Sequence, residues 1–201
     1  MASIVGHALG AVTIWEVGRR LPGDWVPKGA GWYALPVVLA VLPDLDVLAP
    51  MVLSRGGLGG HRGWSHSALV ALMLAGCGVL VLRARSAQLR AWPAFGVLAA
   101  CALVHPLLDY LMGCGPPVPF LWPFWGRGWL SPVQLIPTAN YPLSPAGFLY
   151  ILTMRQTWAG VGLELASLAP LWLAARAGAI TALIALTVSA GGFTATLLLY
   201  N

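Results

Sequence analysis

Six long apolar runs divide this chain, and short polar or Pro- and Gly-rich segments separate them. The runs cover residues 2–18, 31–53, 65–82, 92–112, 157–175 and 178–199. Each is close to the ~20 residues that a helix needs to cross the hydrocarbon core of a bilayer. The pattern predicts an all-α protein, built as a polytopic transmembrane bundle of about six helices.

The second run is the least regular of the six. Pro36, Pro43 and Pro50 interrupt it, and a proline inside a helix removes a backbone donor and clashes with the preceding turn. We therefore expect this run to be kinked or only partly inserted in the membrane.

Residues 112–145, between the fourth and fifth runs, are too rich in Pro, Gly and Trp for a regular helix or strand. Tryptophan and tyrosine side chains prefer the boundary between lipid and water. We therefore predict that this Pro/Trp-rich segment is a loop lying at the membrane interface.

Composition supports the membrane assignment and limits the domain count. Of 201 residues, 59% are hydrophobic and only 8% are charged, which a water-soluble domain with a polar surface does not match. Six spans use up most of the chain, so we expect residues 1–201 to form a single domain. The net charge of +5 comes from scattered basic residues instead of a basic stripe, which argues against nucleic acid as a partner.

The basic residues instead suggest an orientation. If every run crosses the membrane once, seven of them fall on one side, namely Arg19, Arg20, Lys28, Arg83, Arg85, Arg90 and Arg176. Four fall on the other side: Arg55, Arg62, Arg127 and Arg155. By the positive-inside rule the first side is cytoplasmic, and we expect a protein of the inner (cytoplasmic) membrane.

Ionisable residues inside or beside the apolar runs are the main functional signal. They include all four histidines and three of the six carboxylates: His7, Asp44, Asp46, His61, His66, His105 and Asp109. With alternating spans, all seven lie in the leaflet away from the basic loops, and Glu164 in the fifth run lies at a similar depth. Because burying such groups is costly, a shared metal ion bound by imidazole and carboxylate is the simplest explanation.

Local spacing is consistent with this prediction but leaves alternatives open. His105 and Asp109 are four residues apart, so on a helix they share one face and can hold one ion, although a structural His–Asp pair has the same spacing. Two acids as close as Asp44 and Asp46 need a cation or a retained proton. A helix cap at Asp44 would explain only one of them. Ser65 is expected to cap the third helix.

The order of these motifs resembles a known family. The motifs are His7, Leu-Pro-Asp44-Leu-Asp46, His61-Arg-Gly-Trp-Ser-His66-Ser, His105-Pro-Leu-Leu-Asp109, Trp122-Pro-Phe, Pro142-Leu-Ser-Pro and Glu164, spread over residues 1–165. In this order they resemble the YdjM-like family of predicted membrane-bound metal-dependent hydrolases. That family is distantly similar to zinc-dependent phospholipase C and related single-strand nucleases.

The resemblance implies a zinc-type hydrolase, with a phosphoester as the leading bond type. No histidine follows His105, unlike in the phospholipase pattern, so one or two ions are expected in place of a three-metal cluster. The metal ligands would be drawn from His7, Asp44, Asp46, His61, His66, His105, Asp109 and Glu164. A metal-activated water would attack, with Asp44 or Asp46 as an alternative general base and Arg62 stabilising the developing charge.

The position of the site suggests its substrate. A site near headgroup depth at the outer face would suit a lipid or a lipid-linked phosphate or ester, with Arg62, Ser65 and Arg127 as candidate substrate contacts. The main rival is a non-catalytic metal-binding or proton- or metal-coupled transport protein, because intramembrane His and Asp suit that role equally well. An intramembrane protease would be expected to carry H-E-x-x-H, which the sequence lacks.

Overall fold

The computed structural model describes residues 3–23, 25–47, 61–136, 145–177 and 179–201. Regular structure in these ranges is helical, and an isolated antiparallel bridge joins Val118 to Trp129. The α-helices are α1 (Ile4–Arg20), α2 (Ala34–Val41), α4 (Ala68–Arg85), α5 (Ala91–Leu111), α6 (Pro145–Thr153), α7 (Arg155–Arg176) and α8 (Ala179–Tyr200). Three short 3₁₀ helices are η1 (Ala30–Tyr33), η2 (Leu42–Val47) and η3 (Trp64–His66).

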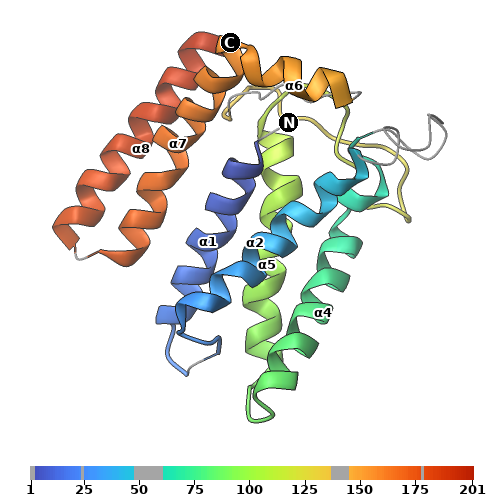
Figure 1. The fold of residues 1–201 in the computed structure, drawn as a ribbon, viewed down its shortest axis with the longest axis vertical. Helices are drawn as coiled ribbons and strands as arrows, with labels where there is room; N and C mark the ends of the chain where they lie inside the picture. The colour runs from blue at the N-terminus through green and yellow to red at the C-terminus, as the bar shows by residue number, and fades with distance from the viewer. Residues whose placement is uncertain (1–2, 24, 48–60, 137–144, 178) are drawn as a thin grey trace.

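The helices form two groups that meet along α1. In Figure 1, α1, α2, α4 and α5 make a bundle, and the α7–α8 hairpin leans against its α1 side. Helix α6 lies across the end of the molecule where the chain starts. Helix α1 contacts α2, α5 and α7, so it connects the bundle to the hairpin.

Five of the six apolar runs correspond to α1, α4, α5, α7 and α8, and the predicted all-helical membrane bundle is confirmed. Within the described ranges, four helices are long and apolar enough to cross a membrane: α4, α5, α7 and residues 180–200 of α8. Helix α1 is slightly shorter, with 17 residues. Helix α6 lies between the fifth predicted run and the Pro/Trp-rich segment, where no helix was expected.

The second run is broken, as its prolines predicted. Its regular α-helix is only eight residues long, and from Leu42 the chain tightens into the 3₁₀ helix η2. Pro43 disfavours a continuing α-helix because it lacks an N–H group. The outcome matters for the site, because Asp44 and Asp46 lie in this 3₁₀ helix. Residues 48–53 of the predicted run, including Pro50, lie outside the described ranges.

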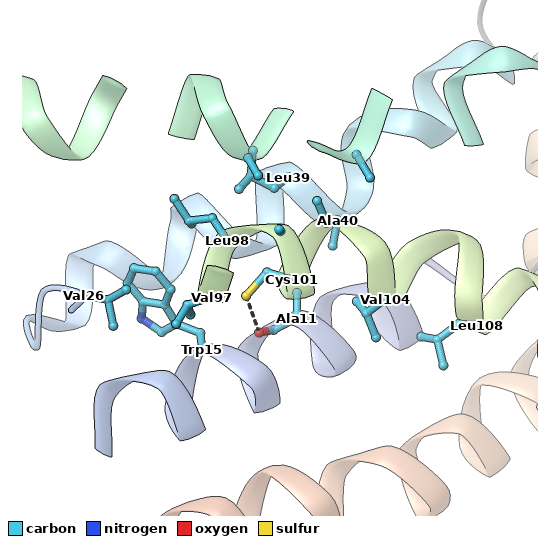
Figure 2. Close-up of a cluster of buried hydrophobic side chains, with 14 of the residues drawn as sticks. Ala11, Trp15, Val26, Leu39, Ala40, Val97, Leu98, Cys101, Val104 and Leu108 are labelled. Carbon is cyan, nitrogen blue, oxygen red and sulfur yellow. Dashed lines mark hydrogen bonds between the residues drawn. The ribbon is translucent and has the colours of Figure 1, made fainter. Parts of the chain in front are cut away.

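Close packing of α1 against α5 forms the core below the ionisable residues. Figure 2 shows Ala11 on α1 beside Cys101 on α5 and Trp15 on the side of Val97, whereas Leu98 lies near Leu39 of α2. The Cys101 thiol donates to the Ala11 carbonyl oxygen at 3.5 Å. Ala11 and Cys101 have small side chains, which permits the close approach of α1 and α5, as expected for helices that pack within lipid.

The two ends of the molecule differ in character. The basic residues Arg19, Arg20, Arg83, Arg85 and Arg176 lie in the last turns of α1, α4 and α7. Figure 1 places these three helix ends together at one end of the molecule. The N-terminal end of α1, the C-terminal end of α5 and η3 lie at the opposite end. Four of the sequence-predicted metal ligands lie on these last segments: His7, His66, His105 and Asp109.

Candidate metal centre

Four segments that are distant in sequence bring their histidines and acids together. His7 comes from the first turns of α1, and His105 and Asp109 come from successive turns of α5. The remaining residues, Asp44, Asp46, His61 and His66, come from η2, η3 and the chain just before η3. The His7 and His105 rings stack with centroids 3.8 Å apart, and the His66 ring lies 4.6 Å from that of His105.

The cluster contains two overlapping sets of possible metal ligands. One set is His7, Asp44, His105 and Asp109, and the other is Asp44, His61, His66 and Asp109. Within each set, one ligand atom of every residue lies within 4.8 Å of the others. Asp44 and Asp109 belong to both sets, so either residue could contribute to a site built from either set.

Distances around Asp44 match those expected between ligands of one small cation. Its Oδ1 lies 3.7 Å from Nε2 of both His66 and His105, and its Oδ2 lies 3.7 Å from Nε2 of His7. Two nitrogen or oxygen ligands on one tetrahedral zinc ion are about 3.4 Å apart, given Zn–ligand distances of ~2.0–2.1 Å. A small inward adjustment would therefore complete such a site.

Asp109 closes the cluster from the side of α5. Its Oδ2 lies 3.3 Å from His66 Nε2, and its Oδ1 lies 3.7 Å from His7 Nε2. Both histidines and Asp109 are fully buried, and Asp44 is 4% exposed. Such burial needs compensation, because isolated ionised carboxylates are strongly disfavoured away from water.

Several inward-facing polar atoms lack a hydrogen bond in the described part of the chain. They are both carboxylate oxygens of Asp44 and the Nε2 atoms of His7, His66 and His105. Buried polar groups are nearly always hydrogen-bonded, so convergent exceptions require an explanation. A bound divalent cation would satisfy these lone pairs together, and the mixed imidazole and carboxylate donor set fits zinc and similar ions.

The outer nitrogens of three histidine rings fix the orientation of those rings. His105 Nδ1 lies 2.6 Å from the carbonyl oxygen of Ala40, and His61 Nδ1 lies 2.9 Å from Asp46 Oδ1. Both partners accept hydrogen bonds, so each Nδ1 carries the proton and each Nε2 presents a lone pair. His66 Nδ1 similarly lies 2.9 Å from Ser65 Oγ. Metal-binding histidines in proteins are typically held in this way.

Asp46 and Ser65 support this arrangement from outside the two ligand sets. Ser65 Oγ donates to Asp46 Oδ2 at 2.7 Å, and Asp46 also accepts from His61. Burial raises the pKa of Asp46, but its contacts with His61 and His66 and the hydrogen bond from Ser65 hold that pKa below the ordinary value. The expected cap role of Ser65 is wrong, because η3 comes first and Ser67 Oγ caps α4 by accepting from Val70 N.

Arg62 is buried, and its guanidinium group hydrogen-bonds to Asp109 and to the loop that follows α5. Its Nε and Nη2 donate to the two oxygens of Asp109 at 3.2 and 3.1 Å. Its Nη1 donates to the carbonyl oxygens of Cys114 and Pro116 at 2.7 and 3.0 Å. Arg62 has a φ of 68°, a left-handed conformation uncommon for residues with a side chain. These contacts indicate that Arg62 orients Asp109.

Glu164 lies beside the cluster but outside both ligand sets. The carboxylate on α7 is fully buried and accepts from the Ser3 backbone N–H at 2.7 Å and from the Ser3 hydroxyl. Gly6 packs directly against it, because a Cβ there would lie 2.9 Å from Glu164 Oε2. Glu164 therefore contacts the N-terminal turn of α1 just before His7.

Arg127 lies apart from the cluster in the segment between α5 and α6. Its side chain is exposed, and Phe124 and Trp125 nearby are 84% and 51% exposed. Trp122 and Leu121 in the same segment are also exposed. This aromatic surface at the cluster's end of the molecule is consistent with the predicted interfacial loop.

Three supporting groups were not found from the sequence. The Ala40 carbonyl gave no signal because any residue carries one. Gly115 permits the approach of Arg62, since its φ is +84° and a Cβ there would lie 3.1 Å from Arg62 Nη1. Ser3 could have been identified, because serine before an apolar helix is a common N-cap, and its Oγ accepts from Gly6 N.

Comparison with known proteins connects this geometry to a family. A model of the family described as YdjM inner membrane protein matches residues 1–195. The inner membrane protein YbcI of Escherichia coli (strain K12) is 34% identical over 111 residues, which cover 54% of this chain. The matched region is 62% of the length of YbcI. No solved structure matches the chain.

Proposed function

This chain belongs to the YdjM family of inner membrane proteins, and from that premise we propose that it is a membrane-embedded, metal-dependent hydrolase. The observation that carries the proposal is the convergence of buried, unpartnered ligand atoms from η2, η3, α1 and α5. Purely structural polar residues would satisfy one another with hydrogen bonds.

We assign the ligands of two ions to the two overlapping sets, with Asp44 and Asp109 shared between them. Zinc is the first candidate because imidazole and carboxylate ligands are mixed. When bound, divalent ions of this kind lower the pKa of a water molecule and polarise the bond to be hydrolysed. Glu164 remains a less favoured ligand, since it lies outside both sets.

The remaining residues have positioning and proton-transfer roles in this proposal. Asp46 holds His61 through Nδ1 and is preferred to Asp44 as proton acceptor, because it lies outside both ligand sets and its side chain keeps 16% exposure whereas that of Asp44 keeps 4%. Arg62 holds Asp109 in one orientation through two parallel hydrogen bonds. Ser65 orients both Asp46 and His66.

A phosphoester of a lipid or lipid-linked molecule is the proposed substrate. Support comes from the depth of the cluster at one end of a membrane bundle and from the exposed aromatic loop at that end. Arg127, exposed in that loop, is the proposed contact for a phosphate group. The outer face is the proposed location, because the basic helix ends lie at the opposite end.

The packing below the cluster favours a hydrolase over a carrier. A transported ion would need polar groups on a path to the other face. Below His7 and His105 lie Ala11, Trp15 and Leu98, all fully buried and apolar (Figure 2). At the far end, Glu16 pairs with Arg19 and accepts from Tyr33.

Metal content and hydrolysis measured on the same detergent-purified samples test the proposal. We expect the wild-type protein to hold divalent metal and to hydrolyse bis-p-nitrophenyl phosphate or a phospholipid. His66→Ala is expected to lose both properties. Cys101→Ala, a buried change one turn from His105 on α5, is the control and is expected to retain both. A folded wild-type protein that binds no divalent metal would overturn the proposal.

A further inference from the structure

An apolar cavity of about 370 Å³ lies between α1, α5, α7 and α8. Gly10, Ile14, Val104, Leu108, Leu168 and Phe193 are among the residues that line it. This volume falls within the ~300–1,000 Å³ typical of small-molecule sites. The metal centre and its proposed mechanism make no use of this space.

The cavity wall offers no polar group to a ligand. Thr13 is the one hydroxyl residue among its lining residues, and its Oγ1 already donates to the Leu9 carbonyl oxygen at 2.7 Å. The other lining residues are aliphatic, aromatic or glycine. A polar or charged ligand would therefore lose hydrogen bonds on entry, whereas a hydrocarbon would not.

The cavity and the metal centre share helices. Val104 and Leu108 directly precede His105 and Asp109 on α5, and Gly10 lies one turn after His7 on α1. In Figure 2, the side chains of Val104 and Leu108 point away from α4 and α2. The neighbouring face of α5 carries the proposed ligands. Helices α1 and α5 thus carry the proposed ligand atoms on one face and line the apolar cavity with the adjacent face.

The chain that follows α5 forms another part of the cavity wall. Leu135 and Ile136 line the cavity, and Ile136 is fully buried. The backbone N–H groups of both residues donate to the Leu111 carbonyl oxygen at 2.8 and 3.3 Å. Gln134 and Asn201 hydrogen-bond each other and tie this segment to the end of α8. The cavity is therefore a partly enclosed site between packed elements.

We propose that this cavity holds one hydrocarbon chain of the lipid substrate while the phosphate group of that lipid reaches the metal centre. The inference rests on the proposed function and deepens it, since it makes the substrate an amphiphile with at least one long chain. A polar site and an apolar site on adjacent faces of α1 and α5 match the two parts of such a molecule.

Photolabelling in vesicles tests the proposal. The probe is a phosphatidic acid that carries a diazirine near the end of one acyl chain, mixed into phosphatidylcholine vesicles with the reconstituted full chain. We expect label on Leu168, Leu171 and Phe193 in excess of label on Leu173 and Leu183, which are exposed on α7 and α8. Equal labelling of cavity and exposed leucines would overturn the proposal, because it would reflect surrounding lipid alone.

Two tryptophan variants of α7 provide a matched comparison. Leu171→Trp fills the cavity, whereas Leu173→Trp changes an exposed leucine on the same helix. We expect loss of the excess label on Leu168 and Phe193 in the first variant and its retention in the second. Thr13→Leu is a second filling variant on α1 and is expected to behave like Leu171→Trp. Retention of the excess label in both filling variants would contradict the proposal.

The metal variant separates this inference from the proposed function. His66→Ala is expected to keep the cavity label, because His66 does not line the cavity. If the wild-type protein binds no metal but still gives the excess label, the hydrolase proposal fails and the chain-binding site stands. If metal and hydrolysis are found without excess label, only the chain-binding site fails.

Discussion

At the scale of single residues, the account depends most on Asp44. Its oxygens lie near three imidazole nitrogens and accept no hydrogen bond from the described residues. It belongs to both ligand sets, whereas His7 belongs to one. If two ions bind, a change at Asp44 should therefore affect both of them, whereas a change at His7 should affect one. If a single ion binds, the two changes should have the same effect.

Asp44→Asn is expected to abolish tight binding at both sites, because the amide removes the charge that the two sets share. His7→Ala is expected to weaken one site and leave the second ion bound. Metal-to-protein ratios, measured by elemental analysis after dialysis against metal-free buffer, distinguish these results. Equal losses in the two variants would contradict the assignment of two sites.

Arg62→Lys is predicted to weaken metal binding by about 10–100-fold, as is typical when a group that orients a ligand is lost. Lysine cannot reproduce the two parallel hydrogen bonds to Asp109. Arg127→Lys, an exposed change at the same end of the molecule, is the control and is expected to leave metal affinity unchanged. Titration with a competing zinc indicator measures both variants. Unchanged affinity in Arg62→Lys would show that Arg62 does not act through Asp109.

The residue types of the cluster were predictable from the sequence, but their individual partners were not. Ionisable groups at one depth of a membrane protein indicate a shared function. The same pattern cannot distinguish a substrate contact from a positioning group, and so Arg62 was expected to face the substrate. Its contact with Asp109 joins residues 47 positions apart, which depends on tertiary packing.

At the scale of elements, α1 is held in place by a contact at its first turn. Glu164 on α7 accepts from Ser3 next to the start of α1, and His7 follows one turn later. A carboxylate at a helix N-terminus is also favoured by the helix dipole. This contact positions the histidine relative to α5.

Glu164→Gln and Glu164→Ala distinguish an anchor from a metal ligand. The glutamine amide oxygen can still accept from the Ser3 backbone N–H, so Glu164→Gln is expected to keep both ions. Glu164→Ala is expected to lower the free energy of unfolding by about 1–3 kcal/mol, because the partly buried Ser3 donors lose their acceptor. Elemental analysis and thermal unfolding in detergent report the two effects. Loss of an ion in Glu164→Gln would identify Glu164 as a ligand.

Hydropathy located the long helices but not the short elements that complete the site. The runs at 65–82, 92–112 and 157–175 correspond to α4, α5 and α7 within a few residues. The prolines predicted a break in the second run, but the 3₁₀ winding of η2 and η3 depends on local contacts. Helix α6 is only nine residues long, too short for the hydropathy pattern of a span.

At the scale of the whole molecule, the distribution of basic residues predicts an orientation. Arg62 was counted among four basic residues on the outer side, but it is buried in an ion pair with Asp109. Arg55, another of the four, lies outside the described ranges. On the basic side, Arg19 and Arg20 likewise pair with Glu16. The predicted orientation therefore still rests on the count of basic residues at the two ends.

Single cysteines introduced into a variant without the three native cysteines test this orientation. A membrane-impermeant maleimide added to intact spheroplasts is expected to label Arg127→Cys, at the end of the metal centre. Arg85→Cys, at the end of α4 on the basic side, is expected to react only after the membrane is opened. The reverse pattern would place the metal centre at the cytoplasmic face.

The most direct test of the central claim is zinc-edge X-ray absorption, together with elemental analysis, on the protein purified without chelators. The account predicts bound divalent metal with nitrogen and oxygen neighbours at ~2.0–2.1 Å, and loss of that signal in Asp44→Asn. A correctly folded wild-type protein that contains no divalent metal, and binds none when zinc is supplied, would contradict it.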